Sequence, residues 1–275
     1  MVKLSQRYQR IIDTCEPFLV SYSENLSALD LAPFGFTIAP ERIYSPTSLR
    51  SRDVIDGLHH LDSFSFGPQE MLMPRWVLFD CGEFPGIVFG FGCLSHTLSA
   101  EVRARYHVEE RDDVFVPLSM WVAIRCAREQ AWFGHNLSSA NLVLGEASLP
   151  GLGTFTKTIG VKITQARHQY GATQWNSSSI NVHLNIGEME LLSAYTPAHT
   201  HPETFTYLIE VDDERLLRSL SPDWQRPRRD VSLTFRSDEP DAIRQLHDDI
   251  EAGSKYFIAS VQTGKPNTLN LWKAP

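Results

Sequence analysis

Two lysines, Lys157 and Lys162, lie in a segment whose apolar residues recur every three or four positions. That spacing predicts an amphipathic helix over residues 152–167. A lysine in an apolar pocket has a lowered pKa, and its neutral amine can form a Schiff base with a carbonyl substrate. One hypothesis is therefore a lysine enzyme with decarboxylase- or aldolase-like chemistry on a keto acid, in which His135 or His183 transfers protons. Surface lysines whose stems lie along the helix are the alternative.

A glycine-rich turn, Pro150 to Gly153, directly precedes this helix. A phosphate-binding loop of the GxxxxGK[ST] type needs glycine immediately before the lysine, and Thr156 stands there instead. The sequence therefore argues against such a nucleotide loop. Gly151 and Gly153 can still leave backbone N–H groups free at the helix start, where a carboxylate or phosphate could dock.

Two segments rich in aromatic and hydrogen-bonding residues flank the helix, AWFGHN at 131–136 and GATQWN at 171–176. We interpret both as turns that line the mouth of one pocket, because they combine bulky rings with groups able to recognise a ligand. Turns whose polar groups only cap neighbouring backbone are the alternative. The candidate ligand-binding residues are Trp132, His135, Asn136, Gln174, Trp175 and His183.

A candidate metal motif follows at His199, His201 and Glu203. Alternate residues of an extended backbone share one face, so these three side chains could converge on one ion. Two imidazoles and one carboxylate suit zinc or a redox metal. Pro197 and Pro202 favour the alternative, a polar loop between two strands.

The elements that would position these residues are first a helical layer and then a sheet. Apolar spacing predicts a helix over residues 4–29, broken near Glu16 by Pro17, and a second helix that begins at Thr47 or Ser48. Aromatic, β-branched or alternating runs predict strands, with an edge position or bulge at Pro117. The predicted strands cover residues 75–80, 86–92, 114–124, 180–186, 190–195 and 204–211, of which 180–186 alternates most clearly.

The resulting fold class is α+β, with a mainly antiparallel sheet that could curl into a barrel and is covered by the helices. We predict a single domain over residues 1–275. Its parts are a helical layer (1–70), a sheet core with the central helix (71–211), an Arg- and Pro-rich connecting segment (212–230) and a C-terminal strand-helix-strand segment (231–275).

Composition limits the classes of function. The formal net charge of −8 argues against sequence-independent binding to nucleic acid or to an anionic membrane. The four cysteines are widely spaced, and the N-terminus turns polar before a signal-peptide core develops. No stretch approaches the roughly 20 apolar residues of a membrane helix. We therefore expect a cytoplasmic protein with reduced thiols.

These observations together favour a protein that binds a small, partly apolar, acidic ligand in a cavity beside the 152–167 helix. The alternatives are the lysine enzyme, a metal-binding protein that uses His199, His201 and Glu203, and a non-catalytic interaction protein. The sequence leaves open whether the protein is an enzyme, which cofactor it takes and how many copies associate.

Overall fold

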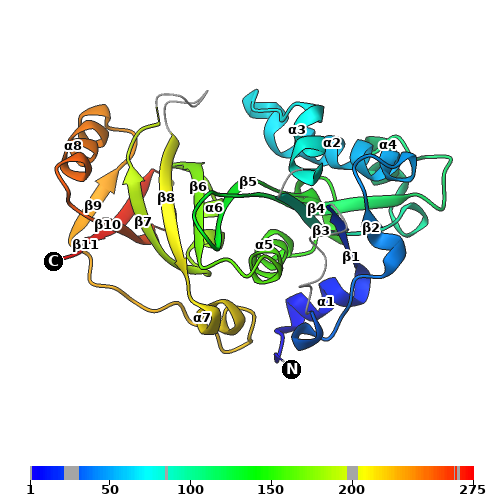
Figure 1. The fold of residues 1–275 in the computed structure, drawn as a ribbon, viewed down its shortest axis with the longest axis horizontal. Coiled ribbons are helices and arrows are strands. Elements are labelled where there is room, and N and C mark those ends of the chain that lie inside the picture. Colours follow the sequence, from blue (N-terminus) through cyan, green and yellow to red (C-terminus); the bar gives the residue numbers. More distant parts are fainter. Residues whose placement is uncertain (1, 22–30, 84–85, 197–203, 263, 265–266) are drawn as a thin grey trace. The chain divides into compact units, whose positions relative to one another are not determined.

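The chain folds into two compact units. Unit 1 comprises residues 1–126, 134–165 and 220–222, and unit 2 comprises residues 127–133, 166–219 and 223–275. The structure is a computed structural model, and it describes residues 2–21, 31–83, 86–196, 204–262, 264 and 267–275 (Figure 1). Each unit has its own stretch of sheet and its own apolar core. The single domain expected from the sequence stays a prediction.

The sheet of unit 1 has the strand order β2-β1-β3-β4-β5. β1 pairs with β2 in parallel, and β3 pairs antiparallel with β1 and with β4. Its strands are β1 (Glu16–Val20), β2 (Ile43–Tyr44), β3 (Gly86–Leu94), β4 (Phe115–Arg125) and β5 (Ala131–Ser139). Its α-helices are α1 (Gln6–Thr14), α2 (Arg52–Phe66), α3 (Arg75–Glu83), α4 (Ala100–Arg105) and α5 (Leu152–Ile163).

A β-bulge next to Pro117 lies between the parts of β4 that face helices α2 and α5. The pairing register between β3 and β4 shifts after Phe91, so that Pro117 lies opposite Gly92. Pro117 therefore faces α2, where a Cβ added at Gly57 would come within 2.5 Å of its ring. On the other side of the bulge, Trp121 faces α5. Figure 1 shows α2 and α5 on opposite faces of the sheet of unit 1. The bulge at Pro117 expected from the sequence is confirmed.

The core of unit 1 forms where α5 meets β3 and β4. Phe155 of α5 stacks on Phe91 with 5.1 Å between ring centroids, and Tyr8 of α1 stacks on Phe155 at 5.2 Å. A Cβ at Gly160 would come within 2.3 Å of the Trp121 ring, so α5 approaches the sheet as closely as only glycine permits. Packing of aromatic rings thus fixes α1, α5 and the sheet together.

Unit 2 is built on the strand order β6-β8-β7-β10-β11-β9, and its described pairs are all antiparallel. Trp175 lies at the centre of its core, against Phe205 and Phe235 at 4.2 and 4.8 Å. The strands are β6 (His168–Gln174), β7 (Gly187–Ser193), β8 (Thr204–Val211), β9 (Leu233–Arg236), β10 (Tyr256–Val261) and β11 (Thr268–Lys273). The helices are α6 (Ser179–His183), α7 (Asp213–Arg218) and α8 (Pro240–Glu251).

The mainly antiparallel α+β fold is confirmed, but a barrel is not found among the described residues. The strand order begins at β2 and ends at β9, so the sheet is open. The strand expected at 75–80 is wrong, because this segment is helix α3. Leu78 and Cys81 are buried three positions apart on one side of that helix, while Trp76 and Phe79 are exposed.

Two further secondary-structure predictions, for residues 180–186 and for residues 131–136, were wrong. The alternation at 180–186 falls on helix α6 and the turn that follows it, where Ile180 and the C-cap residue Leu184 are buried four positions apart and Val182 is only half-buried. The AWFGHN segment is strand β5 rather than a turn, because backbone pairing in the sheet outweighs the local preference of Gly134 for a turn.

The remaining elements follow the sequence more closely. The first helix ends at Thr14, just before Pro17, although strand β1 and not more helix comes next. The central helix stops at Ile163, four residues early, and the C-terminal segment expected as strand-helix-strand contains β9, α8, β10 and one further strand, β11. Among the described residues, no helix combines the length and apolar composition needed to cross a membrane.

Candidate functional site

Free backbone N–H groups gather at the start of α5. Gly151 adopts a left-handed conformation (φ +87°), which ends the preceding segment and turns the chain into the helix. The amides of Gly151, Gly153 and Thr154 have no hydrogen-bond acceptor among the described residues, and all three residues are only half-buried. The first turn of α5 carries no acidic side chain either. The positive end of the helix dipole is therefore open to an anion.

Two side chains of α1 lie against this helix start. A Cβ at Gly151 would be 3.0 Å from Cε1 of Tyr8 and 3.6 Å from Nε of Arg7. The guanidinium of Arg7 lies over the Tyr8 ring, 4.5 Å from its centroid, while Arg7 itself remains exposed. Arg7 thus adds a full positive charge beside the free amides of α5.

The hydroxyl of Tyr8 has no hydrogen bond of good geometry among the described residues, although the Arg7 side chain lies close enough to act against the rise of its pKa. The residue is fully buried, and burial raises the pKa of its hydroxyl, against the smaller opposing effect of Arg7. Of the Tyr8 ring atoms, Cε1 lies nearest to Gly151. Cε1 is bonded to the carbon that carries the hydroxyl, so the hydroxyl end of the ring faces the glycine. A buried hydroxyl without a partner is costly, and a bound oxygen atom would satisfy it.

Lys157, in the second turn of α5, is the more deeply buried of the two candidate lysines. Its side chain is 1% exposed, and burial holds its pKa well below the usual value, whereas Lys162 is half-buried. The apolar spacing of the sequence places Lys157 further from the apolar stripe than Lys162, so the observed order of burial is the reverse of that expectation. A neutral amine is what Schiff-base chemistry needs, but Lys157 does not line any of the hollows described below. Its catalytic role stays a prediction.

Asn136, a predicted ligand-binding residue, forms hydrogen bonds to other side chains of unit 1. Its side-chain amide donates to Oδ1 of Asp62 at 2.7 Å and accepts from the Ser138 hydroxyl at 2.8 Å. Asp62 is fully buried and also accepts the backbone N–H of Met73 at 2.7 Å. Burial raises the pKa of the Asp62 carboxyl, and these two hydrogen bonds act in the opposite direction. Asn136 therefore stabilises a buried acid of α2.

The other predicted ligand-binding residues lie on several elements, and their shared role in one pocket stays a prediction. Trp175 is a core residue of unit 2, whose indole N–H donates to the Ala194 carbonyl at 3.1 Å. His183 lies at the end of α6, buried with its ring 4.9 Å from that of Tyr207, and not on the strand expected from the sequence. Trp132 and the exposed His135 are strand residues of β5, and Gln174 is the last residue of β6.

The candidate metal residues His199, His201 and Glu203 lie outside the described residues. Within the part of the chain that the structure describes, no group of three or more His, Cys, Asp or Glu side chains could hold a metal ion. The metal hypothesis therefore stays a prediction.

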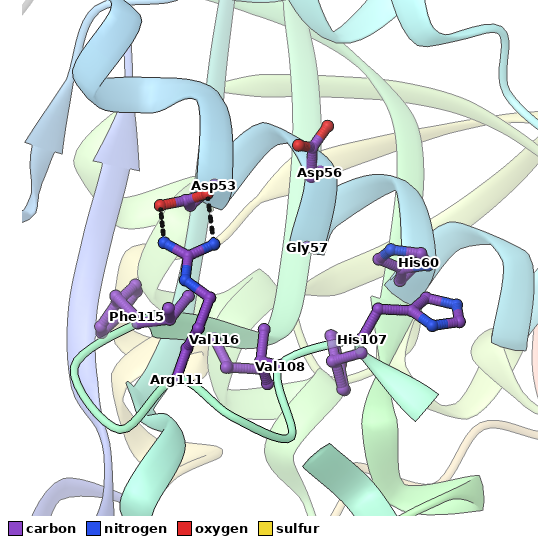
Figure 2. Close-up of a pocket in the computed structure, with 11 residues that line it drawn as sticks. Asp53, Asp56, Gly57, His60, His107, Val108, Arg111, Phe115 and Val116 are labelled. Carbon is purple, nitrogen blue, oxygen red and sulfur yellow. Dashed lines mark hydrogen bonds and ion pairs between the residues drawn. The ribbon is translucent and has the colours of Figure 1, made fainter. Parts of the chain in front are cut away.

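A small hollow of about 150 Å³ lies between α2 and residues 106–116 (Figure 2). At one end the Arg111 guanidinium binds the Asp53 carboxylate at 3.0 and 2.7 Å, which holds the pKa of Asp53 low. At the other end the His60 and His107 rings lie 4.9 Å apart. Burial and, less strongly, His107 lower the pKa of His60, so its imidazole is neutral at pH 7. In this hollow, Asp53 and Arg111 are thus already paired with each other.

Sequence reasoning identified the free amides of α5 but missed Arg7 and Tyr8. The signal for Tyr8 was its place on the apolar face of α1, which shows that the ring is buried but not which helix it meets. Nothing in the sequence pattern singles out Arg7, because an exposed arginine beside the apolar face of α1 resembles any other charged surface residue.

Comparisons with known proteins do not assign this chain to a family. No family model matches it, and no curated protein does. Solved structures resemble it weakly. A diaminobutyrate acetyltransferase from Paenibacillus lautus, in complex with L-2,4-diaminobutyric acid and coenzyme A, is 12% identical with a TM-score of 0.36 and covers 58% of this chain and 89% of its own.

Two further structures give similar values. The NatC complex bound to Gag peptide and CoA is 12% identical over 61% of this chain and 96% of its own, with a TM-score of 0.39. A protein from Desulfovibrio desulfuricans described as a GNAT-family acetyltransferase is 14% identical over 60% and 95%, with a TM-score of 0.37. A likeness at this level assigns neither an activity nor a ligand to the chain.

Proposed function

We propose that the protein binds a phosphate-bearing small molecule at the start of α5. The free amides of Gly151, Gly153 and Thr154, beside the guanidinium of Arg7, are the observation that supports this. Backbone amides at a helix start bind anions through hydrogen bonds and through the helix dipole, and an arginine strengthens binding of phosphate in particular. The Tyr8 hydroxyl, which has no hydrogen bond of good geometry among the described residues, offers the ligand one more hydrogen bond.

A phosphate fits this site better than a carboxylate. Three amides and one guanidinium supply more donors than the two oxygens of a carboxylate usually accept, whereas a phosphate group presents three oxygens. The ligand's remaining part would lie outside the helix start, where Gly151, Gly153 and Thr154 are half-buried rather than enclosed. We therefore expect a ligand that carries a phosphate or diphosphate within a larger molecule.

Binding of coenzyme A, measured by calorimetry with the full chain, tests this proposal. Coenzyme A carries a diphosphate and is named with two of the weakly similar structures, and pantetheine is a matched control without phosphate. We expect coenzyme A or, failing that, ATP or inorganic pyrophosphate to bind, and pantetheine not to bind. Equal binding of pantetheine and coenzyme A, or no binding of any of the phosphates, would contradict the proposal.

Two substitutions at Gly153 make the test specific to charge. A Cβ there meets only Ser139, at an ordinary 3.9 Å, so both Gly153→Glu and Gly153→Gln should fold. The glutamate favours the helix start but repels an anion, and we expect binding of the phosphate ligand to be lost with it and weakened only slightly with glutamine. Arg7→Gln should weaken binding about 10- to 100-fold, the usual strength of a charge-assisted hydrogen bond.

A further inference from the structure

Unit 1 has an apolar surface recess that is unrelated to the start of α5. Pro46, Leu49, Ile55, Trp76 and Phe79 line it, and we call these five residues the apolar recess. It occupies about 560 Å³ between residues 46–52, the beginning of α2 and helix α3. Leu49 is 91% exposed and Trp76 64% exposed, which is unusual for side chains of this size in a folded protein.

Specific contacts hold the walls of the recess in place. Arg75 of α3 forms an ion pair with Asp56 of α2, which joins the two helices beside the recess. Pro46 packs against α3, since a Cβ at Gly82 would come within 2.9 Å of its ring. The Ser48 hydroxyl accepts the Arg50 backbone N–H at 3.3 Å and fixes the turn that presents Leu49. The exposed apolar groups are thus part of a defined shape.

The rim of the recess is basic although the chain is acidic. Arg52 and Arg75 line it with side chains 78% and 52% exposed. Both form an ion pair with the more buried Asp56, so these three residues carry one net positive charge. The chain as a whole has a net charge of −8. Tryptophan and arginine around an apolar centre are also the residues that most often dominate binding energy in protein interfaces.

We propose that the apolar recess docks a segment of a partner polypeptide that carries an apolar side chain flanked by acidic residues. The apolar side chain fills the hollow against Trp76 and Phe79, and its acidic neighbours pair with Arg52 and Arg75. A second copy of this chain fits less well, because a two-fold interface would bring the two arginine rims together. An anionic membrane fits less well too, because the surface is hollow and the chain strongly negative.

Selection from a library of random peptides displayed on phage, with the full chain as bait, tests this inference. We expect enriched peptides to share an apolar or aromatic residue flanked by Asp or Glu. A synthetic, dye-labelled copy of one such peptide should then bind in fluorescence anisotropy. Trp76→Ala should weaken its binding at least 10-fold, and Arg52→Glu should weaken it and reduce its dependence on salt.

Leu49→Asp and Leu142→Asp form a matched pair of variants. Leu142 is 80% exposed in the same unit but does not line the recess, so only Leu49→Asp should abolish peptide binding. Three outcomes would overturn the inference. In the first, selection enriches no peptide. In the second, the selected peptides bind Leu49→Asp and Leu142→Asp equally well. In the third, the protein dimerises or binds phosphatidylserine vesicles, and Leu49→Asp abolishes that dimer or that binding. Coenzyme A titrated into Leu49→Asp reports separately on the start of α5.

Discussion

The amine of Lys157 links the stability of unit 1 to pH. Its side chain is buried, and burial holds its pKa well below the ordinary value. Between that lowered pKa and about 10.4, the unfolded chain therefore binds more protons than the folded chain. The buried amine therefore destabilises the folded state most below this window. The destabilisation decreases as the pH rises across the window.

Replacement of this lysine by an apolar side chain of similar volume should therefore stabilise the protein. We expect Lys157→Met to raise the free energy of unfolding by about 1–4 kcal/mol at pH 7, because the folded chain would no longer hold an amine that is protonated more readily in the unfolded chain. The gain should shrink as the pH approaches 10. Urea unfolding followed by circular dichroism at several pH values measures both effects.

The matched control for this prediction is Lys162→Met, on the same helix but half-buried. Its effect should stay within about 0.5 kcal/mol, as for most surface substitutions. Stability curves of Lys157→Met and the unsubstituted protein that run parallel between pH 7 and 10 would show that the amine is not held neutral by folding.

At the scale of elements, α6 shows how a local pattern misleads. Its apolar residues alternate as in a strand, yet the structure buries Ile180 and Leu184 fully and Val182 only in part. We expect Leu184→Gln to cost about 2–5 kcal/mol, as for other large core residues that are removed, and Val182→Gln less than about 1 kcal/mol. Thermal unfolding compares the two, and equal losses would favour the strand.

The elements that the sequence predicted well are those whose pattern is both long and unambiguous. The spacing of apolar residues identified α5, and the Pro117 bulge followed from the missing backbone donor of proline. The short runs at 75–80 and 180–186 fit either secondary structure, and packing against distant residues decides between them. The same limit applies to the site. Gly151 and Gly153 carried a local signal, whereas the approach of Arg7 depends on how α1 packs.

At the scale of the molecule, each unit has its own core, and a disturbance of one core should remain largely within it. Gly160→Ala tests this, because the added methyl would clash with Trp121 in unit 1. We expect a loss of about 1–3 kcal/mol, typical of an overpacked core. In hydrogen exchange by mass spectrometry, peptides from β3 and β4 should lose protection, and those from β7 and β10 should keep most of theirs. Equal loss in both units would show that they unfold as one.

Each unit also contains one fully buried tryptophan, and the two indoles differ in their hydrogen bonding. Trp175 donates to a carbonyl oxygen, whereas the Trp121 N–H has no partner among the described residues. An indole in apolar surroundings without a hydrogen bond fluoresces at shorter wavelength than one that donates. The chain has four other tryptophans, so a Trp121→Phe, Trp175→Phe double variant is needed to subtract their emission. In the difference spectrum, the wavelength at which intensity falls first on heating tells whether unit 1 or unit 2 unfolds first.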